Sequence, residues 1–187
     1  MNGKISNVQK ITYTSILIAL AASLRIVKYS IFGPMQFISF PGIFTILGGV
    51  LFGPVTGGVV GVASYLISDI MIGMPGPWTP VNCMLMGAVG FGSGLIWGKR
   101  EKVKISRTGM MIGTYLLMFI FDVASSWILL MLIMGNAFEA LIVGLLGLFM
   151  PNPTAGGWMF AVGPITEFTT ASVLTMLVQV LSRSKVH

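Results

Sequence analysis

Long apolar stretches alternate with short polar or Gly/Pro-rich breaks along almost the whole chain. Six stretches predict membrane-spanning helices, and they cover residues 11–32, 41–52, 54–72, 81–97, 108–134 and 158–181. A helix needs about 20 apolar residues to cross the hydrocarbon core. The short stretch 41–52 therefore predicts a thin, tilted or partly re-entrant span. The apolar piece 138–150 is too short to span alone and predicts an interfacial helix or a lid.

Glycine and proline mark the ends of these stretches. Gly33 and Pro34 end the first, and Gly135 with Asn136 ends the fifth. Pro54 and Pro80 stand where the third and fourth stretches begin, and proline is favoured at the first position of a helix. The third and fourth stretches are joined by the loop Gly76-Pro77-Trp78-Thr79-Pro80, and the acid Asp69 lies near the end of the third stretch.

The composition agrees with a membrane protein. Of 187 residues, 55% are hydrophobic and 9% are charged, whereas a soluble domain carries about 25% charged residues. The length suits one compact membrane unit and leaves too little polar sequence for a second, soluble domain. We therefore expect a single domain over residues 1–187, an all-α integral protein with six transmembrane helices in the cell membrane.

The distribution of basic residues predicts the orientation. Six spans put both ends of the chain on one side of the membrane, and the basic residues on that side are Lys4, Lys10, those of the 99–107 loop, Arg183 and Lys185. The opposite side has Lys28 near its first loop, with Glu139 nearby. Loops rich in Lys and Arg stay in the cytoplasm, so we expect both termini there. The net charge of +6 then reflects topology and does not indicate nucleic-acid binding.

Small residues recur every four positions on three spans: Ser15, Ala19 and Ser23; Gly57 and Gly61; Gly90, Gly94 and Gly98. This spacing lets helix backbones approach closely in lipid. On the third and fourth spans it predicts packing within the molecule. On the first span it predicts either internal packing or a face that docks a partner subunit.

Four ionisable residues lie inside spans, where charges are costly and default to functional hypotheses. They are Arg25, Asp69, Asp122 and Glu167. At about 1.5 Å per residue, each falls at the midplane or in the outer half of a core about 30 Å thick. Polar and aromatic residues expected at the same outer mouth are Trp78, Thr79, Asn82, Trp127 and Trp158.

These residues have two interpretations. Arg25 could pair with Asp122 or Glu167 simply to hold helices together. Alternatively, the nine residues could line an outward-facing pocket, since a binding site is usually concave, mostly apolar and fixed by a few polar groups.

Several kinds of site are excluded. The only histidine is the last residue, His187, and the only cysteine is Cys83, so we expect no metal centre, no cofactor and no Ser-His dyad. The sequence around Gly98-Lys99 lacks the Ser or Thr that a phosphate-binding loop needs after its lysine. An intramembrane enzyme using Asp69, Asp122 or Glu167 as acid or base would lack an accompanying nucleophile, so we do not expect an enzyme.

A family resemblance follows from these features. The small-residue stripe on the first span, the turn Leu51-Phe52-Gly53-Pro54-Val55-Thr56-Gly57 and the acid late in the third span resemble substrate-binding (S) components of energy-coupling factor (ECF) vitamin transporters. The 76–80 loop running into Asn82 looks most like the subgroup linked to cobalamin-type corrinoids.

The resemblance implies a function and partners. An S component captures a vitamin from outside and docks through its first-span stripe, here Ser15, Ala19 and Ser23, onto a membrane coupling subunit that carries two ATPases. It then topples in the bilayer and releases the vitamin inside. The alternative is a stand-alone carrier or channel that uses the intramembrane acids as an ion path.

Overall fold

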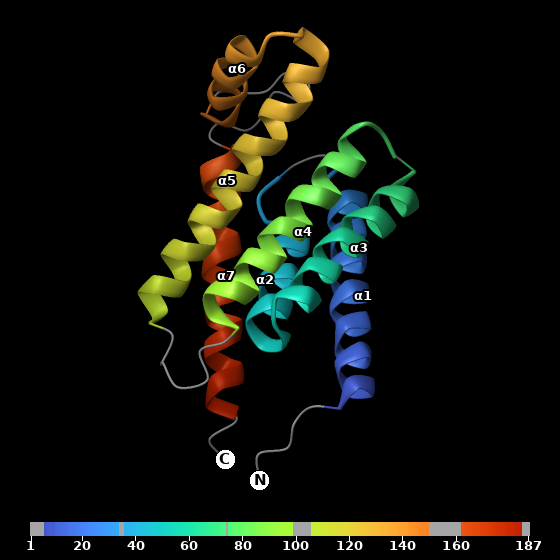
Figure 1. Ribbon diagram of the computed structural model, residues 1–187, viewed down its shortest axis with the longest axis vertical. Helices are drawn as coiled ribbons and strands as arrows, with labels where there is room; N and C mark the ends of the chain where they lie inside the picture. Colours follow the sequence, from blue (N-terminus) through green and yellow to red (C-terminus); the bar gives the residue numbers. More distant parts are fainter. Residues whose placement is uncertain (1–5, 34–35, 74, 99–105, 150–161, 185–187) are drawn as a thin grey trace.

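The computed structural model describes residues 6–33, 36–73, 75–98, 106–149 and 162–184, which form seven α-helices (Figure 1). They are α1 (Asn7–Phe32), α2 (Phe40–Phe52), α3 (Pro54–Ile72), α4 (Trp78–Trp97), α5 (Arg107–Met134), α6 (Ala137–Phe149) and α7 (Val162–Ser184). Among these residues, α1, α3, α4, α5 and α7 are long and apolar enough to cross a membrane. The all-α membrane class is confirmed, whereas the count of six spans and the cytoplasmic termini remain predictions.

Local sequence explains the helix ends. Ser6 and Gln9 form a reciprocal capping box at the start of α1, which satisfies backbone N–H groups that the first turn leaves unpaired. Gly33, Gly73 and Gly135 end α1, α3 and α5 with positive φ, a conformation that glycine adopts without steric cost. The fourth helix begins at Trp78, earlier than the predicted position 81. Pro80 therefore lies within the first turn of α4, where proline is tolerated because the N–H it lacks would have no helical partner.

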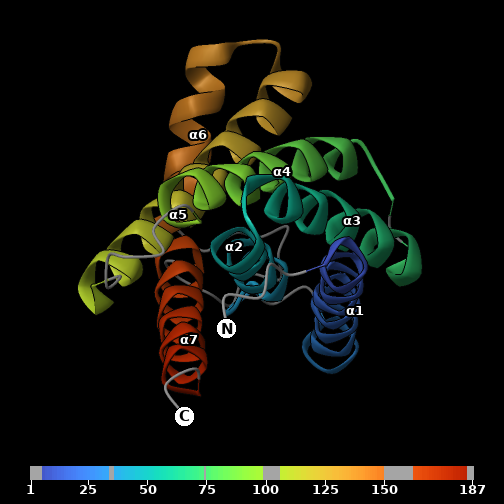
Figure 2. The same cartoon turned by 60° about the horizontal axis from the view of Figure 1, so that its bottom comes forward.

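The short helix α2 lies at the centre of the bundle. It packs against α1, α3, α4 and α7, and Figure 2 shows it between α1 on one side and α7 on the other. Most of its residues are buried, including Ile43, Ile46 and Leu47. Although α2 is shorter than a full span, it therefore enters the core and does not lie along the surface.

Glycines allow α2, α3 and α4 to pack with their backbones in contact. A Cβ added at Gly57 on α3 would clash with the carbonyl of Gly90 on α4, and a Cβ at Gly49 on α2 would clash with Ser93. A Cβ at Gly61 would lie 2.5 Å from the carbonyl oxygen of Met86. Close internal packing of the third and fourth spans is thus confirmed.

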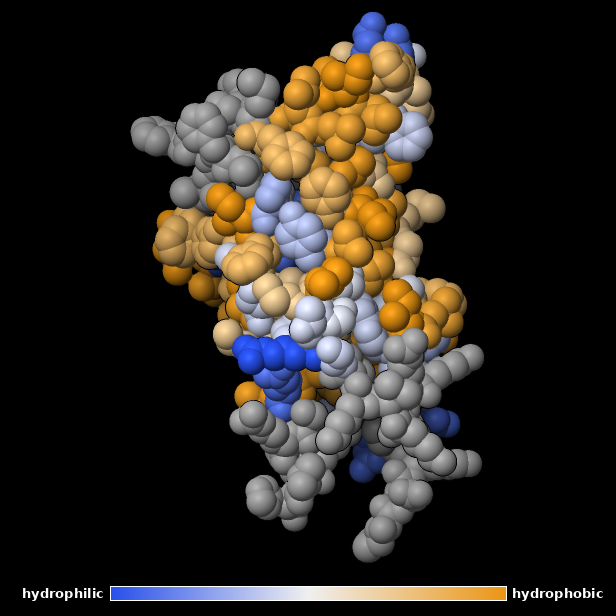
Figure 3. Space-filling view, turned by 90° about the vertical axis from the view of Figure 1, so that its left-hand side faces the viewer, coloured by the Kyte–Doolittle hydropathy of each residue, from blue (hydrophilic) through white to orange (hydrophobic). Residues whose placement is uncertain are grey.

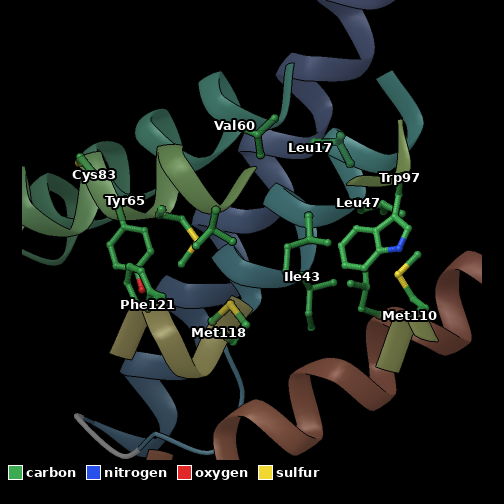
Figure 4. Close-up of a cluster of buried hydrophobic side chains, with 14 residues drawn as sticks. Leu17, Ile43, Leu47, Val60, Tyr65, Cys83, Trp97, Met110, Met118 and Phe121 are labelled. Carbon is green, nitrogen blue, oxygen red and sulfur yellow. The ribbon is translucent and has the colours of Figure 1, made fainter. Parts of the chain in front are cut away.

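A hydrophobic core extends from this glycine contact towards α5. Val60 and Ile43 lie in its middle, with Trp97 and Met110 towards one end and Tyr65 with Phe121 towards the other (Figure 4). The Tyr65 and Phe121 rings are tilted against each other with centroids 5.8 Å apart. This contact joins α3 to α5.

The outer surface is mostly apolar, as lipid contact requires. Figure 3 views the side on which α5 and α6 lie, and hydrophobic residues cover most of its upper part. Exposed side chains of α5 include Ile112, Leu116, Ile120 and Leu132. The helix α6 packs mainly along α5 through Ala140, Gly144 and Leu148, and lies at the end of the molecule opposite the start of α1 (Figure 1).

Candidate functional site

Polar side chains from five helices gather towards one end of the bundle. Arg25 and Asp69 lie late in α1 and α3, and Asp122 lies in the second half of α5. Thr79, Asn82 and Glu167 lie early in α4 and α7, which run in the opposite direction (Figure 1). All these positions are nearer the α6 end than the end where α1 begins.

Arg25 and Asp69 form the centre of this polar region. Arg25 Nη1 lies 2.5 Å from Asp69 Oδ1, and the same nitrogen donates a hydrogen bond to the Ser68 hydroxyl. The second carboxylate oxygen, Asp69 Oδ2, accepts a hydrogen bond of 2.7 Å from Thr79 Oγ1. The Asp69 side chain is 4% exposed. Arg25 therefore pairs with Asp69, and not with Asp122 or Glu167 as one of the two interpretations of the sequence had it.

Tyr65 holds the Arg25 side chain from its other side. The guanidinium carbon lies 4.5 Å from the centroid of the Tyr65 ring, within the range of a cation–π interaction. Because Tyr65 also contacts Phe121 on α5, the arrangement joins α1, α3 and α5. Asp69 is one turn beyond Tyr65 on α3, so both reach the same arginine.

Lys28 is buried one turn beyond Arg25. Its side chain is 7% exposed, and its ammonium donates to Gln36 Oε1 at 2.7 Å and to the Ile38 carbonyl at 3.3 Å. Both acceptors belong to the segment that connects α1 to α2. Among the described residues, Arg25–Asp69 is the ion pair that the structure contains. The Lys28 charge therefore has no carboxylate partner there and is compensated by these two neutral acceptors and by the Phe37 ring, whose centroid lies 5.8 Å from Nζ.

A cavity of about 140 Å³ lies between these groups. Its lining residues are Arg25, Lys28, Tyr29, Gly33, Gln36, Asp69, Ile72 and Trp78. The lining combines charged ends with two aromatic rings. Three residues predicted for the site, Arg25, Asp69 and Trp78, thus meet at one cavity.

The segment that carries Gln36 is fastened to α7. The backbone N–H of Ser39 donates to Thr170 Oγ1 at 2.9 Å, and Thr169 Oγ1 donates to the Phe37 carbonyl. These contacts fix the part of the cavity wall to which Gln36 belongs. They also lie one turn from Glu167 along α7.

Two further polar contacts join α5 to its neighbours. Ser125 Oγ donates to Asn82 Oδ1 at 2.5 Å, which links α5 to α4. The Asp122 and Glu167 carboxyls lie near each other between α5 and α7. Glu167 is fully buried, and neither of its carboxylate oxygens accepts a hydrogen bond from a described donor.

The remaining predicted residues are placed differently. Trp127 is partly exposed, and its Nε1 donates to the Ala137 carbonyl at 2.9 Å, which ties α5 to the start of α6. Trp158 lies outside the described residues. Ser15, Ala19 and Ser23 are all exposed on the outer face of α1. Their role as a docking face remains a prediction.

Sequence reasoning missed Lys28 and Gln36 as members of the site. Lys28 was interpreted as a charge of the outer loop, although it follows Arg25 by three residues and so shares its helix face. Tyr65 and Ser68 carried no signal beyond their positions on the face of Asp69. Within the described residues, no three His, Cys, Asp or Glu side chains come together in a way that could hold a metal ion.

A comparison with known protein families gives a match. Residues 5–152, most of the chain, match the family described as ECF-type riboflavin transporter, S component. No curated protein and no solved structure gives a match. The match is to a riboflavin family, and the cobalamin-type subgroup stays a prediction. The chain therefore belongs to the ECF-type riboflavin transporter S components, membrane proteins that capture a vitamin for an ECF transporter and are not enzymes.

Proposed function

We propose that the chain captures a flavin-type vitamin from outside the cell and passes it to a membrane coupling subunit driven by two ATPases. The observation that carries this proposal is the family match over residues 5–152. The resemblance of the 76–80 loop to the cobalamin-linked subgroup makes a corrinoid the second candidate ligand.

The cavity between α1, α3 and α4 supports a binding role. A flavin has a planar, largely apolar ring system and a chain of hydroxyl groups, so its site needs aromatic faces and polar partners. Trp78 and Tyr29 provide the rings, and Arg25 and Gln36 provide the polar groups. Pockets for whole drug-sized ligands are roughly 300–1,000 Å³. A cavity of about 140 Å³ matches one end of such a ligand, with Trp78 at its side.

The side of the membrane on which the cavity lies is inferred from the basic residues at the opposite end of the molecule. The lysine- and arginine-rich segments predict that α1 begins in the cytoplasm. The polar residues lie late in α1 and α3 and early in α4 and α7, so the polar region lies away from the start of α1. In this orientation the cavity opens towards the outer leaflet, where a captured vitamin would enter.

Ligand retention tests the proposal. The protein is purified in detergent, and its bound small molecules are identified by mass spectrometry. Riboflavin and cyanocobalamin are then titrated separately. We expect saturable quenching of flavin fluorescence at one site per chain and no saturable binding of cyanocobalamin. Retention of a corrinoid would overturn the flavin assignment.

Transport without partners separates capture from a carrier or channel. The purified chain alone in liposomes should move neither flavin nor ions, because energy coupling is assigned to the partner subunits. Ion flux through liposomes that contain this chain alone would instead support the stand-alone carrier or channel.

A further inference from the structure

The buried ammonium of Lys28 is the least compensated charge at the cavity. It contacts Gln36 Oε1 and the Ile38 carbonyl, and its side chain is 7% exposed. Burying an ion without a counter-ion costs free energy that neutral dipoles only partly offset. The neighbouring Arg25 cannot compensate the charge of Lys28, because it is also a cation.

The lining of the cavity is positive overall. It contains Arg25 and Lys28 against a single acid, Asp69. Asp69 already interacts with Arg25 and accepts from Thr79. An anion entering the cavity would therefore meet one cation that has no described carboxylate partner.

We propose, building on the vitamin-capture function proposed above, that Lys28 and Gln36 form a subsite for an anionic group of the captured solute, a phosphate ester or a carboxylate. Lys28 supplies the charge. An anionic oxygen in the cavity takes up its hydrogen bond in place of, or beside, Gln36 Oε1. The aromatic part of the solute then lies towards Trp78, which lines the same cavity.

The test compares two flavins that differ only in a phosphate. Riboflavin and riboflavin 5′-phosphate are titrated into the detergent-purified protein by fluorescence quenching. Since a charge-assisted hydrogen bond is about twice as strong as a neutral one, we expect the phosphate ester to bind about tenfold more tightly. Equal affinities, or tighter binding of riboflavin, would overturn the subsite.

Two variants assign the effect to Lys28. Lys28→Met keeps an unbranched apolar side chain and removes the charge, so the tenfold preference for the phosphate ester should vanish, whatever the change in riboflavin affinity itself. Gln36→Glu places a carboxylate next to the ammonium and should remove the preference by competition. Lys10→Met, at an exposed position on the same helix, is the matched control and should retain it. A preference that survives both site variants would overturn the proposal.

Membrane lipid is a second source of phosphate. The titration is repeated in nanodiscs made of phosphatidylcholine and of phosphatidylglycerol. If phosphatidylglycerol abolishes the preference in the wild type, a lipid phosphate reaches the same subsite. If the preference persists, the subsite serves the soluble ligand. Both results retain Lys28 as the anion-binding residue.

A failure of the flavin assignment can be distinguished from a failure of the subsite. If neither flavin binds, the proposed ligand is wrong, and the subsite is then tested with inorganic phosphate. Phosphate should raise the melting temperature of the wild type above that in chloride at equal ionic strength, and should not do so for Lys28→Met. Equal shifts in both proteins would overturn the subsite.

Discussion

Arg25 on α1 and Asp69 on α3 form an ion pair of 2.5 Å that connects two helices at the lining of the cavity. The pair is supported from both sides, by the Tyr65 ring beneath the guanidinium and by the Thr79 hydroxyl on the carboxylate. It therefore fixes the relative positions of α1, α3 and α4 as well as the polar lining of the site.

Removal of one partner of this pair should destabilise the protein. Breaking a buried ion pair costs about 3–5 kcal/mol because the remaining charge is left uncompensated. We expect Asp69→Asn to lower the melting temperature in detergent and to weaken ligand binding. Arg25→Met combined with Asp69→Leu should recover most of the stability but not the binding. A double variant no more stable than Asp69→Asn would contradict this account.

Trp78 should contribute to ligand affinity. Its side chain is 38% exposed beside the cavity, and loss of an aromatic stacking contact costs about 1–3 kcal/mol. We expect Trp78→Ala to weaken flavin binding at least about tenfold while the protein stays folded. Trp127→Phe serves as the control. Trp127 donates its hydrogen bond to the start of α6, so this variant should keep its flavin affinity. An unchanged affinity in Trp78→Ala would remove Trp78 from the site.

The Asp122–Glu167 contact predicts an unusual effect of an amide substitution. Glu167 is fully buried and its oxygens lack described donors, so Glu167→Gln would give the Asp122 carboxyl a hydrogen-bond donor. Because a net hydrogen bond is worth about 1 kcal/mol, we expect a higher melting temperature. Glu139→Gln, on the exposed face of α6, should have no effect. A lower melting temperature in Glu167→Gln alone would show that the carboxyl pair is stabilising as it stands.

Two glycines of α4 offer a matched test of the helix packing. A Cβ at Gly90 clashes with the backbone of Gly57, whereas a Cβ at Gly92 has nothing within 4 Å. Overpacking typically costs about 1–3 kcal/mol, so we expect Gly90→Ala to be strongly destabilising. Gly92→Ala should be neutral or slightly stabilising, as alanine favours helix more than glycine by about 1 kcal/mol. Equal thermal stabilities of the two variants would refute the close α3–α4 contact.

The small-residue stripe of α1 should matter for transport alone. Ala19 is exposed on the same face as Ser15 and Ser23, so Ala19→Trp would keep a partner helix at a distance without entering the cavity. We expect normal ligand binding and loss of vitamin uptake in cells that carry the coupling subunit and ATPases. Ile120→Trp, at an exposed position on α5, should leave uptake intact. Normal uptake with Ala19→Trp would place the docking surface elsewhere.

The sequence predicts most helix ends because glycine and proline mark them. Pro54 opens α3, and Gly33 and Gly135 end α1 and α5, as expected. The central position of α2 could not be predicted, since a short apolar stretch is equally compatible with a surface or a core location. Its burial depends on the glycines of α3 and α4 that let three backbones meet.

The pairing of the charges could not be predicted from the sequence. Four ionisable residues on four helices allow several pairings, and the contact of Arg25 with Asp69 depends on Tyr65 and Thr79, which carry no charge. Lys28 was missed for a related reason. A lysine near the end of a membrane helix usually extends its ammonium to the membrane–water interface. Residues 36–38, however, fold back over Lys28 and accept hydrogen bonds from its ammonium.

Two hydrogen bonds between α7 and the segment before α2, from Thr169 Oγ1 to the Phe37 carbonyl and from the Ser39 N–H to Thr170 Oγ1, have a mechanical consequence. They tie residues 37 and 39 to α7, whereas Lys28 ties Gln36 and Ile38 of the same segment to α1. A tilt of α7 relative to α1 would pull Gln36 away from Lys28 and take the wall of the cavity apart. Release of the solute would then depend on the tilt of α7 relative to α1, and neither helix would need a hinge.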